Sequence, residues 1–372
     1  MKTNIIYLAL AAFFSACFSL AAIAQNNILY DALVSVEERS EAARQAAFRD
    51  ALSEVFVKVS GQSSTLTHAQ VKATLQNASE LAERYEYRTI PSISPDQPPG
   101  LGLLVSFQSN RVDDVLRSAN LPIWGKDRPL PLAWVLLSED NQTRIINSDD
   151  LPMAYGALSK RSDQRGIPMV FPLLDIDDRL ALNTRQLQQF EHTSIQQASQ
   201  RYVPDAILAG HVFPTALDSS VPAWISCPDS LLKAGQWADA CAWQGQWWLY
   251  LGEDKWHWAY LKKERDDILA QGVDFMTNTL AQRFAEPEAP PETLEVTIHG
   301  VSTLGDYATV QKYLRELGVV LDMQILEISS NRMKVQLKAR GGESALARAI
   351  SLGYSLEPRG LMREGIHYQL LR

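Results

Sequence analysis

The segment Glu286-Pro287-Glu288-Ala289-Pro290-Pro291-Glu292 constrains the fold of this 372-residue chain more than any other. Its three prolines lack backbone N–H donors, so the segment cannot continue a helix or enter the interior of a sheet. Its three glutamates keep it solvated and extended. We therefore expect a linker over 286–292 that divides the folded part of the chain into separate modules.

Residues 1–24 have the composition of a secretory signal peptide. Lys2 supplies a positive charge, and Ile5–Leu20 is almost entirely apolar or small. Small residues at the positions that a signal peptidase reads predict cleavage between Ala24 and Gln25. The apolar run is short for a membrane span, so we expect a periplasmic mature chain with no transmembrane segment.

Two alternatives to a cleaved signal stay open. One is a retained N-terminal anchor, and the other is lipidation of Cys17, although the residues before Cys17 match a lipobox poorly. If the signal is removed, Cys227 and Cys241 are the remaining cysteines, and an even count in an oxidising compartment favours a disulfide between them. Closing their loop of about 14 residues would stabilise the fold by about 3 kcal/mol. Two separate buried thiols are the alternative.

The composition is that of a globular protein that binds no nucleic acid. Hydrophobic residues make up 46% of the chain and charged residues 21%, which is enough apolar material for real cores. The formal net charge is −8, and no block of basic residues offsets it. A protein that tracks a phosphate backbone needs such a block, so a nucleic-acid partner is excluded.

Hydrophobic periodicity predicts an α+β or α/β chain of several modules. Residues 25–122 read as an N-terminal βααββ-type module. Its first helix begins after Ser40 and ends at Gly61, and a Thr67/Gln70 capping box starts a second helix that runs to about residue 84. The strands are expected at Ile28–Val36, Tyr85–Ile93 and Leu101–Gln108, with a short helix at Arg111–Ala119.

Residues 128–285 alternate apolar runs with helical patterns, which is typical of a central α/β module with parallel strands. The runs are Leu130–Leu137, Ile167–Leu174 and Ala206–Phe213, and the helices are expected at Pro152–Arg165 and Thr184–Tyr202. Two aromatic strands follow, at Ala242–Leu251 and Trp256–Lys262, before a closing helix at Asp266–Phe284.

Residues 293–372 have the element order of a ferredoxin-like βαββαβ module, which leaves one sheet face open. The elements are expected at Leu294–Val301, Leu304–Leu317, Val320–Ile328, Arg332–Ala339 and Glu343–Leu352, with one or two short strands after them.

The search for catalytic chemistry finds no catalytic residue and no cofactor motif. The chain has no nucleophile elbow, zinc-protease helix, phosphate-binding glycine loop or dinucleotide fingerprint. Its six histidines are scattered, and none pairs with another at the spacing of metal ligands. These absences favour a binding role over an enzymatic one.

Three carboxylates, Asp175, Asp177 and Asp178, directly follow the apolar run Ile167–Leu174. If that run is a parallel strand, they lie at its carboxyl end, where open α/β sheets bind ligands. They could hold Mg²⁺ or Ca²⁺ there. The alternative is a solvated loop whose acids favour the start of the next helix.

Tryptophans crowd the two aromatic strands. Trp243 and Trp247 share one side of the first strand, and Trp248 faces the other; Trp256 and Trp258 lie together on the second strand. At a sheet edge only one face can be core, so the second face is a candidate stacking surface for glycan or an aromatic anchor for a partner protein. Packing of the aromatic rings in the core is the alternative.

One strand of the last module has a cationic face. Basic residues alternate with Met333, Val335, Leu337 and Ala339, a pattern that predicts a half-buried strand; the basic residues are Arg332, Lys334, Lys338 and Arg340. The face is either ordinary solvated surface or a docking site for an acidic partner or anionic headgroups.

Several segments resemble the bacterial domain of unknown function 2066 family. They are Phe171–Asp175, Ala198–Ala206, Trp243–Trp247 and the helix within Ser40–Gly61. The resemblance implies an exported envelope protein of Gram-negative bacteria, and it implies no activity, cofactor or catalytic residue. We therefore expect a non-catalytic periplasmic binding or adaptor protein with an envelope protein partner. The alternative is a peptidoglycan-binding or peptidoglycan-processing protein that uses the tryptophan strands and the aspartate cluster.

Overall fold

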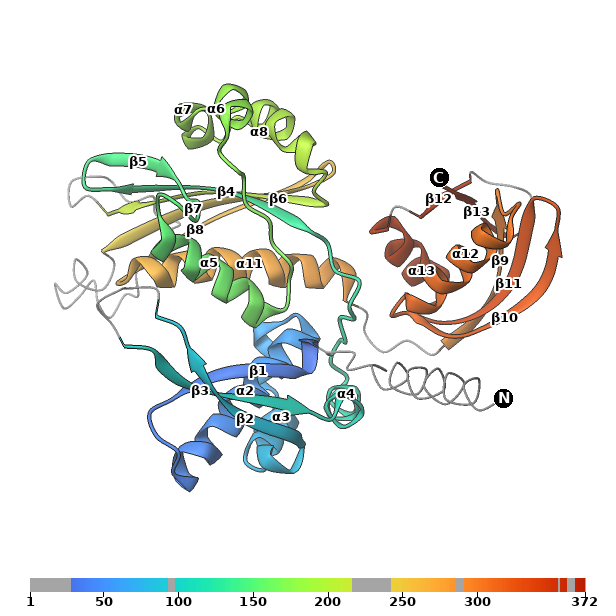
Figure 1. The fold of residues 1–372 in the computed structure, drawn as a ribbon, viewed down its shortest axis with the longest axis horizontal. Coiled ribbons are helices and arrows are strands. Elements are labelled where there is room, and N and C mark those ends of the chain that lie inside the picture. The colour runs from blue at the N-terminus through green and yellow to red at the C-terminus, as the bar shows by residue number, and fades with distance from the viewer. Residues whose placement is uncertain are drawn as a thin grey trace, which may run out of the picture.

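The computed structural model describes residues 28–92, 98–215, 242–285, 291–353, 355–359 and 365–371. Over these residues the chain is a mixed α/β protein with three sheets and ten α-helices, and each sheet has a hydrophobic core of its own (Figure 1). The signal with its cleavage site at Ala24 and Gln25, the cysteines Cys227 and Cys241, and linker residues 286–290 lie outside the described residues.

The N-terminal sheet is antiparallel with strand order β1-β3-β2, and one long helix packs on it. The strands are β1 (Asp31–Val36), β2 (Ala82–Ile90) and β3 (Gly100–Phe107). The helix α2 (Glu41–Ser60) has the two predicted ends. The Ser40 side chain accepts a hydrogen bond from the Ala43 N–H, and Gly61 stops the helix in the left-handed conformation at φ 71°. A shorter helix, α4 (Ser109–Ser118), follows the sheet.

The predicted second helix of this part is wrong in length and in its cap. A short α3 (Ala69–Leu75) replaces it, between the 3-10 turns at Ser63–Thr67 and Ala78–Glu80. The capping box does not form because the Thr67 hydroxyl donates to the Ser64 carbonyl and the Gln70 amide donates to the Ser118 hydroxyl.

The middle of the chain forms a five-stranded sheet, order β5-β4-β6-β7-β8, with helices on both faces (Figure 1). Its strands are β4 (Pro131–Glu139), β5 (Gln142–Ile145), β6 (Ala206–Pro214), β7 (Trp243–Leu251) and β8 (Asp254–Lys262). Among the described strands of this sheet, only β4 and β6 pair in parallel. One face packs against α5 (Pro152–Arg165) and α11 (Arg265–Phe284), and the other against α6 (Ile176–Ala181), α7 (Thr184–Gln188) and α8 (His192–Ser199).

The expected strand at Ile167–Leu174 is not formed. Only Val170 bridges to the sheet, where its N–H donates to the Pro131 carbonyl and its carbonyl accepts from the Ala133 N–H. Pro168 and Pro172 carry no N–H for a ladder, and Leu174 turns the chain away at φ 53°. The helix expected over Thr184–Tyr202 is also divided, into α7 and α8.

The C-terminal sheet has the strand order β10-β11-β9-β13-β12, with both of its helices on one face (Figure 1). The strands are β9 (Pro291–His299), β10 (Val320–Ser329), β11 (Arg332–Arg340), β12 (Leu356–Pro358) and β13 (Ile366–Leu370), and the helices are α12 (Leu304–Glu316) and α13 (Gly342–Ser351). The order departs from the four-stranded ferredoxin-like sheet because β13 inserts between β9 and β12 and runs parallel to β9. Pro291 and Glu292, predicted as linker, begin β9.

Trp247 is the centre of the middle core and is fully buried. Its ring lies against two glycines, Gly210 on β6 and Gly272 on α11, and a Cβ added at either would lie 2.4 Å from the ring. Trp258 beside it stacks on Phe275 with ring centroids 4.0 Å apart. The missing side chains at the two glycines therefore make the space that lets α11 lie close to the sheet.

We expect Trp247→Ala to lower the free energy of unfolding by about 4 kcal/mol, because the backbone around the two glycines cannot collapse into the cavity. The matched control is Leu180→Ala, at a side chain 81% exposed on α6, which should change stability by less than about 0.5 kcal/mol. Urea unfolding followed by far-ultraviolet circular dichroism measures both. Equal losses in the two variants would contradict the central role of Trp247.

A buried histidine on β6 should make stability sensitive to acid. His211 is 6% exposed with its Nε2 2.8 Å from the Ser138 hydroxyl, and burial lowers its pKa to about 4. The unfolded chain takes up this proton near pH 6.5, so stability falls as the pH drops from there towards 4. Between pH 7 and 5 we expect the wild type to lose about 2 kcal/mol more than His211→Gln. Parallel pH dependences in urea unfolding would refute this.

Candidate functional site

The aspartate cluster is an internally paired helix start. Asp175 caps α6 by accepting from the Asp178 N–H at 3.0 Å. The Arg201 guanidinium holds both Asp175 oxygens, at 2.7 and 2.9 Å, and one Asp178 oxygen at 3.1 Å. The other Asp178 oxygen accepts from the Tyr202 hydroxyl at 2.5 Å. Hydrogen bonds from Arg201 lower the pKa of Asp175 to about 2.

This pairing gives no support to the predicted metal site. Among the residues that the structure describes, no three His, Cys, Asp or Glu side chains come together as ligands. Asp175 and Asp178 already neutralise Arg201, so a cation would have to displace a guanidinium before it met them. Asp177 is exposed on the first turn of α6. Because Ile167–Leu174 is not a strand, the cluster also does not lie at the carboxyl end of one.

The tryptophans of β7 and β8 pack on both faces of the sheet, because α11 covers one face and α7 and α8 cover the other. Trp247 and Trp258 are buried on the α11 side, and Trp243 and Trp256 pack half-buried against the same core. On the other face Trp248 stacks over His257, with ring centroids 4.8 Å apart, and packs against the second core. Among the described residues, these five rings therefore serve mainly to pack the two cores.

The cationic row of β11 is present as predicted, but acidic side chains neutralise part of it. The row lies on the open face, by which we mean the face of the C-terminal sheet opposite α12 and α13. Arg332 pairs with Glu327 at 3.1 Å and Lys334 with Glu295 at 2.7 Å. Lys338 lies opposite Asp322 in the β10 register. Arg340 lines a cavity beside the sheet.

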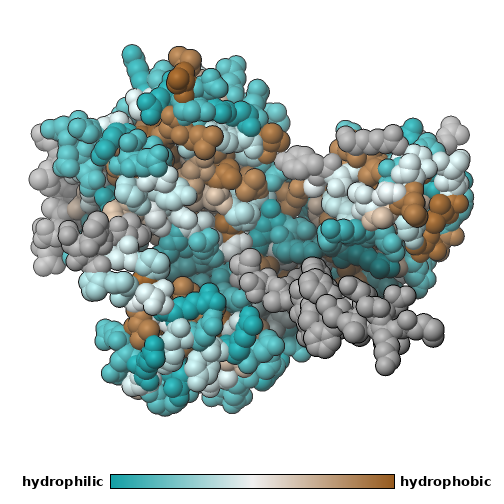
Figure 2. Space-filling view, in the orientation of Figure 1, coloured by the Kyte–Doolittle hydropathy of each residue, from teal (hydrophilic) through white to brown (hydrophobic). Residues whose placement is uncertain are grey.

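The outer edge of β10 was not foreseen as a site. This strand ends the sheet and carries several exposed apolar side chains: Leu321 and Leu326 (both 45% exposed), Ile328 (57%) and Ile325 (36%). Figure 2 shows hydrophobic side chains gathered on the outer side of the C-terminal part, where Figure 1 places β10. In the sequence, β10 carries apolar residues at positions that face both sides of the sheet. A strand with one buried face would alternate apolar and polar residues, so this pattern could have indicated the site.

The structure brings together two histidines that lie far apart in the sequence. His299 on β9 and His367 on β13 lie on the open face, with the Nε2 of His299 3.1 Å from the Nδ1 of His367. Burial and the charges of Arg359, His367 and Arg332 lower the pKa of His299. The pair depends on β13 lying parallel to β9, a neighbour relation that sequence spacing does not reveal.

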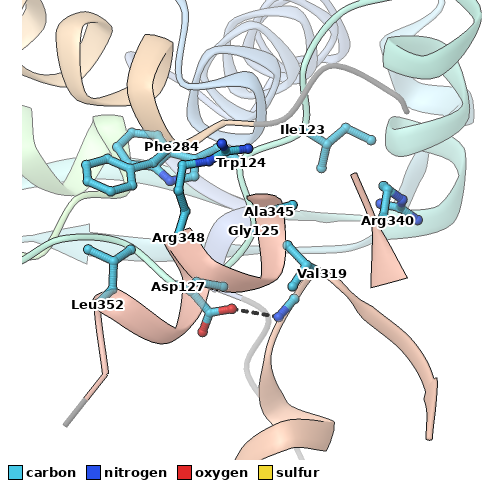
Figure 3. A pocket seen from close by; sticks show the side chains of 12 residues that line it. Ile123, Trp124, Gly125, Asp127, Phe284, Val319, Arg340, Ala345, Arg348 and Leu352 are labelled. Atoms are coloured by element: carbon cyan, nitrogen blue, oxygen red, sulfur yellow. Dashed lines mark hydrogen bonds between the residues drawn. The ribbon is translucent and has the colours of Figure 1, made fainter. Parts of the chain in front are cut away.

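A cavity of about 60 Å³ lies where the C-terminal part meets the rest of the molecule (Figure 3). Trp124, Phe284 and Leu352 form apolar walls, and Arg348 points across it. Beside it an Asp127 carboxylate oxygen accepts from the Gly318 N–H at 2.6 Å. Organic ligands occupy pockets of several hundred Å³, so this cavity is large enough for water only. It is a packing gap at the contact between two parts of the fold.

Two buried arginines join the N-terminal part to the middle sheet. One terminal nitrogen of Arg165 donates to the Ser63 hydroxyl and an Asp274 carboxylate oxygen, at 2.9 and 2.8 Å. The other donates to the Gly61 carbonyl and the Asn278 side-chain oxygen, both at 2.8 Å. Arg128 donates to five backbone carbonyls and lies 4.5 Å above the Trp124 ring. Burial, followed by the charge of Arg165, lowers the pKa of Arg128 to about 9.

We expect Arg165→Met to lower the free energy of unfolding by about 3 kcal/mol, because it strands buried acceptors on both sides of the junction. The matched control is Arg161→Met. Arg161 binds the same Asp274 carboxylate but is 30% exposed, so its loss should cost about 1 kcal/mol or less. Urea unfolding of both variants checks the difference, and a larger loss at Arg161 would contradict it.

Comparison with protein families finds a match over the N-terminal part of the chain alone. A family model described as a domain of unknown function (DUF8605) matches residues 23–125, which include β1, α2, β2, β3 and α4. This is a domain of unknown function, as expected, but from a different family than the one the sequence resembles. No curated protein matches the chain. In the part of the chain that the structure describes, no helix is long and apolar enough to cross a membrane.

Proposed function

We propose that this chain is a non-catalytic periplasmic adaptor of the Gram-negative envelope, one that captures an extended segment of a partner protein along β10. Export would follow cleavage between Ala24 and Gln25, and the oxidising compartment would allow a Cys227–Cys241 disulfide. The N-terminal apolar run and the resemblance to the domain of unknown function 2066 family support the location.

The observation that carries the proposal is the edge of β10. Its outward N–H and C=O groups pair with no strand among the described residues, and its apolar side chains are exposed beside them. An unpaired edge of this kind is a template for an added strand, with backbone hydrogen bonds supplying affinity and side chains supplying specificity.

Charge indicates the chemistry of the partner segment. Asp322 and Glu327 lie on the open face of β10, and the inner neighbour β11 sets Lys338 and Lys334 opposite them. An added outer strand meets the same two acids, so basic residues suit its open face and apolar residues suit its helix side.

Two irregularities, at Leu321 and Leu326, divide the pairing of β10 into short regular runs, 322–325 and 327–329. The exposed Leu326 and Ile328 side chains would therefore anchor the segment, and the backbone pairing would be brief. An edge with such bulges selects a short segment and resists pairing with long flat strands.

The alternative function is binding or processing of peptidoglycan. It would use the five tryptophans of β7 and β8 together with the Asp175–Asp178 cluster. Packing occupies most of those rings, and Arg201 occupies two of the carboxylates, so no geometric observation favours this alternative.

Two synthetic peptides test the strand-addition proposal, one alternating valine with lysine and one alternating valine with glutamate. We expect the lysine peptide to bind and the glutamate peptide not to, and the double variant Leu326→Lys/Ile328→Lys to weaken binding at least about tenfold. Fluorescence anisotropy measures binding, and circular dichroism confirms folding. Equal affinity for the two peptides, or no effect of the double variant, would refute the proposal.

Photo-crosslinking in cells tests the same edge with the natural partner. A crosslinking amino acid at position 326 should capture a protein that the same amino acid at Leu304 does not; Leu304 is 83% exposed at the start of α12. Identical products from both positions would count against β10 as the docking edge.

A further inference from the structure

A cleft of about 600 Å³ lies between α11 and β8, the outer strand of the middle sheet. One stripe of α11 lines it, at positions spaced three and four residues apart from Asp267 to Asn278. These positions cover about three turns of helix, so the cleft runs about 16 Å along α11. Organic ligands occupy spaces of this volume, whereas the cavity at the C-terminal part is about 60 Å³.

One wall of the cleft is aromatic. Tyr260 on β8 and Phe275 on α11 line it, with ring centroids 6.5 Å apart. The buried Trp258 stacks on Phe275 at 4.0 Å and so holds that ring in place. Burial raises the pKa of Tyr260, so its hydroxyl stays protonated at neutral pH and can donate a hydrogen bond. This wall therefore offers a rigid surface to the apolar face of a ligand.

The charges of the lining balance one another. Arg161 on α5 binds both oxygens of Asp274 at 2.8 Å, which leaves that carboxylate little capacity for a ligand. Lys262 and Asp267 lie on either side of the short connection between β8 and α11, and neither forms an ion pair with another described residue. Two cations and two acids thus line the cleft, so it favours neither an anion nor a cation.

Asn278 presents a fixed hydrogen-bond donor three turns further along α11. Its Oδ1 accepts from Arg165 at 2.8 Å and from the Ser63 N–H at 3.1 Å. These two donors determine how the amide points, because its NH₂ group cannot accept from them. The Nδ2 of Asn278 donates to no described residue. The lining therefore offers a donor at Asn278 and an acceptor at the Asp267 carboxylate.

We infer that the cleft binds a short, uncharged oligosaccharide. Each sugar hydroxyl both donates and accepts hydrogen bonds, so it suits a wall on which donors and acceptors are mixed. The C–H face of a sugar ring is apolar and packs on an aromatic surface. A hydrocarbon ligand would leave the polar groups of the lining unpaired, and an ion would gain little from balanced charges.

This site is separate from the surfaces described above. The partner segment at β10 lies on the C-terminal sheet, and the tryptophans of β7 and β8 pack in the cores. An oligosaccharide in the cleft would contact β8, α11 and Ser63, at the junction between the N-terminal part and the middle sheet. The inference therefore goes beyond the adaptor role, because one chain would hold a glycan and a partner protein at different places.

Saturation-transfer NMR on the full mature chain tests the inference with three neutral probes: maltotriose, cellotriose and chitotriose. We expect at least one of them to bind with a dissociation constant of about 1 mM or below. Inorganic phosphate and spermidine, a small anion and a small cation, should not displace it. No binding of any probe at about 10 mM, or displacement by either ion, would overturn the inference.

Asn278→Asp keeps the oxygen that accepts from Arg165 and removes the donor, so it should weaken binding about tenfold. The matched control is Gln282→Glu, the same amide-to-acid change one turn further along α11, at an exposed side chain outside the cleft. It should keep affinity within about twofold. Equal losses in the two variants would contradict the site. The variant Leu326→Lys/Ile328→Lys should bind the probe as the wild type does, which separates failure of this site from failure of the β10 edge.

Discussion

The buried guanidinium of Arg165 imposes the contact between the N-terminal part and the middle sheet. A charged group removed from water costs the fold several kcal/mol unless other groups pair with it. The two terminal nitrogens of Arg165 find partners on two separate elements, the end of α2 at Gly61 and the side of α11 at Asp274 and Asn278. The two parts cannot shift relative to each other without leaving that charge unpaired. Arg128 reinforces the junction through backbone carbonyls of Lys58 and Gly166.

The C-terminal part is joined to the rest differently. The contacts there include a hydrogen bond between Asp127 and Gly318 and the walls of a small cavity. Its sheet leaves one face and one edge uncovered by any described element. The β10 edge, for which we propose a partner segment, lies there. The proposed binding role fits this division, because the buried charges hold the scaffold together and the open sheet leaves backbone groups and side chains exposed.

Local sequence patterns predicted some elements correctly. They failed where contacts with residues distant in the sequence determine the structure. The helix α2 was foreseen because Ser40 and Gly61 act on their own neighbours, and α5 begins and ends where its periodicity does. The strand predicted over the apolar run Ile167–Leu174 was wrong. Hydrophobicity indicates that the run is buried, but its prolines prevent the backbone hydrogen bonds of a strand. The alternation on β11 was predicted correctly, whereas the acids that pair with Arg332 and Lys334 come from neighbouring strands.

The sequence by itself determined the features that depend on residues close along the chain: helix ends, strand alternation and the apolar signal-like start. The tertiary structure alone decided which strands are neighbours. Only the insertion of β13 beside β9 brings His299 to His367. Only the helices packed on both faces of the middle sheet cover the tryptophans of β7, and only the sheet order leaves β10 at an edge. The physical reason is that hydrogen bonds between strands are the same for every sequence, so register and order follow from packing of whole faces.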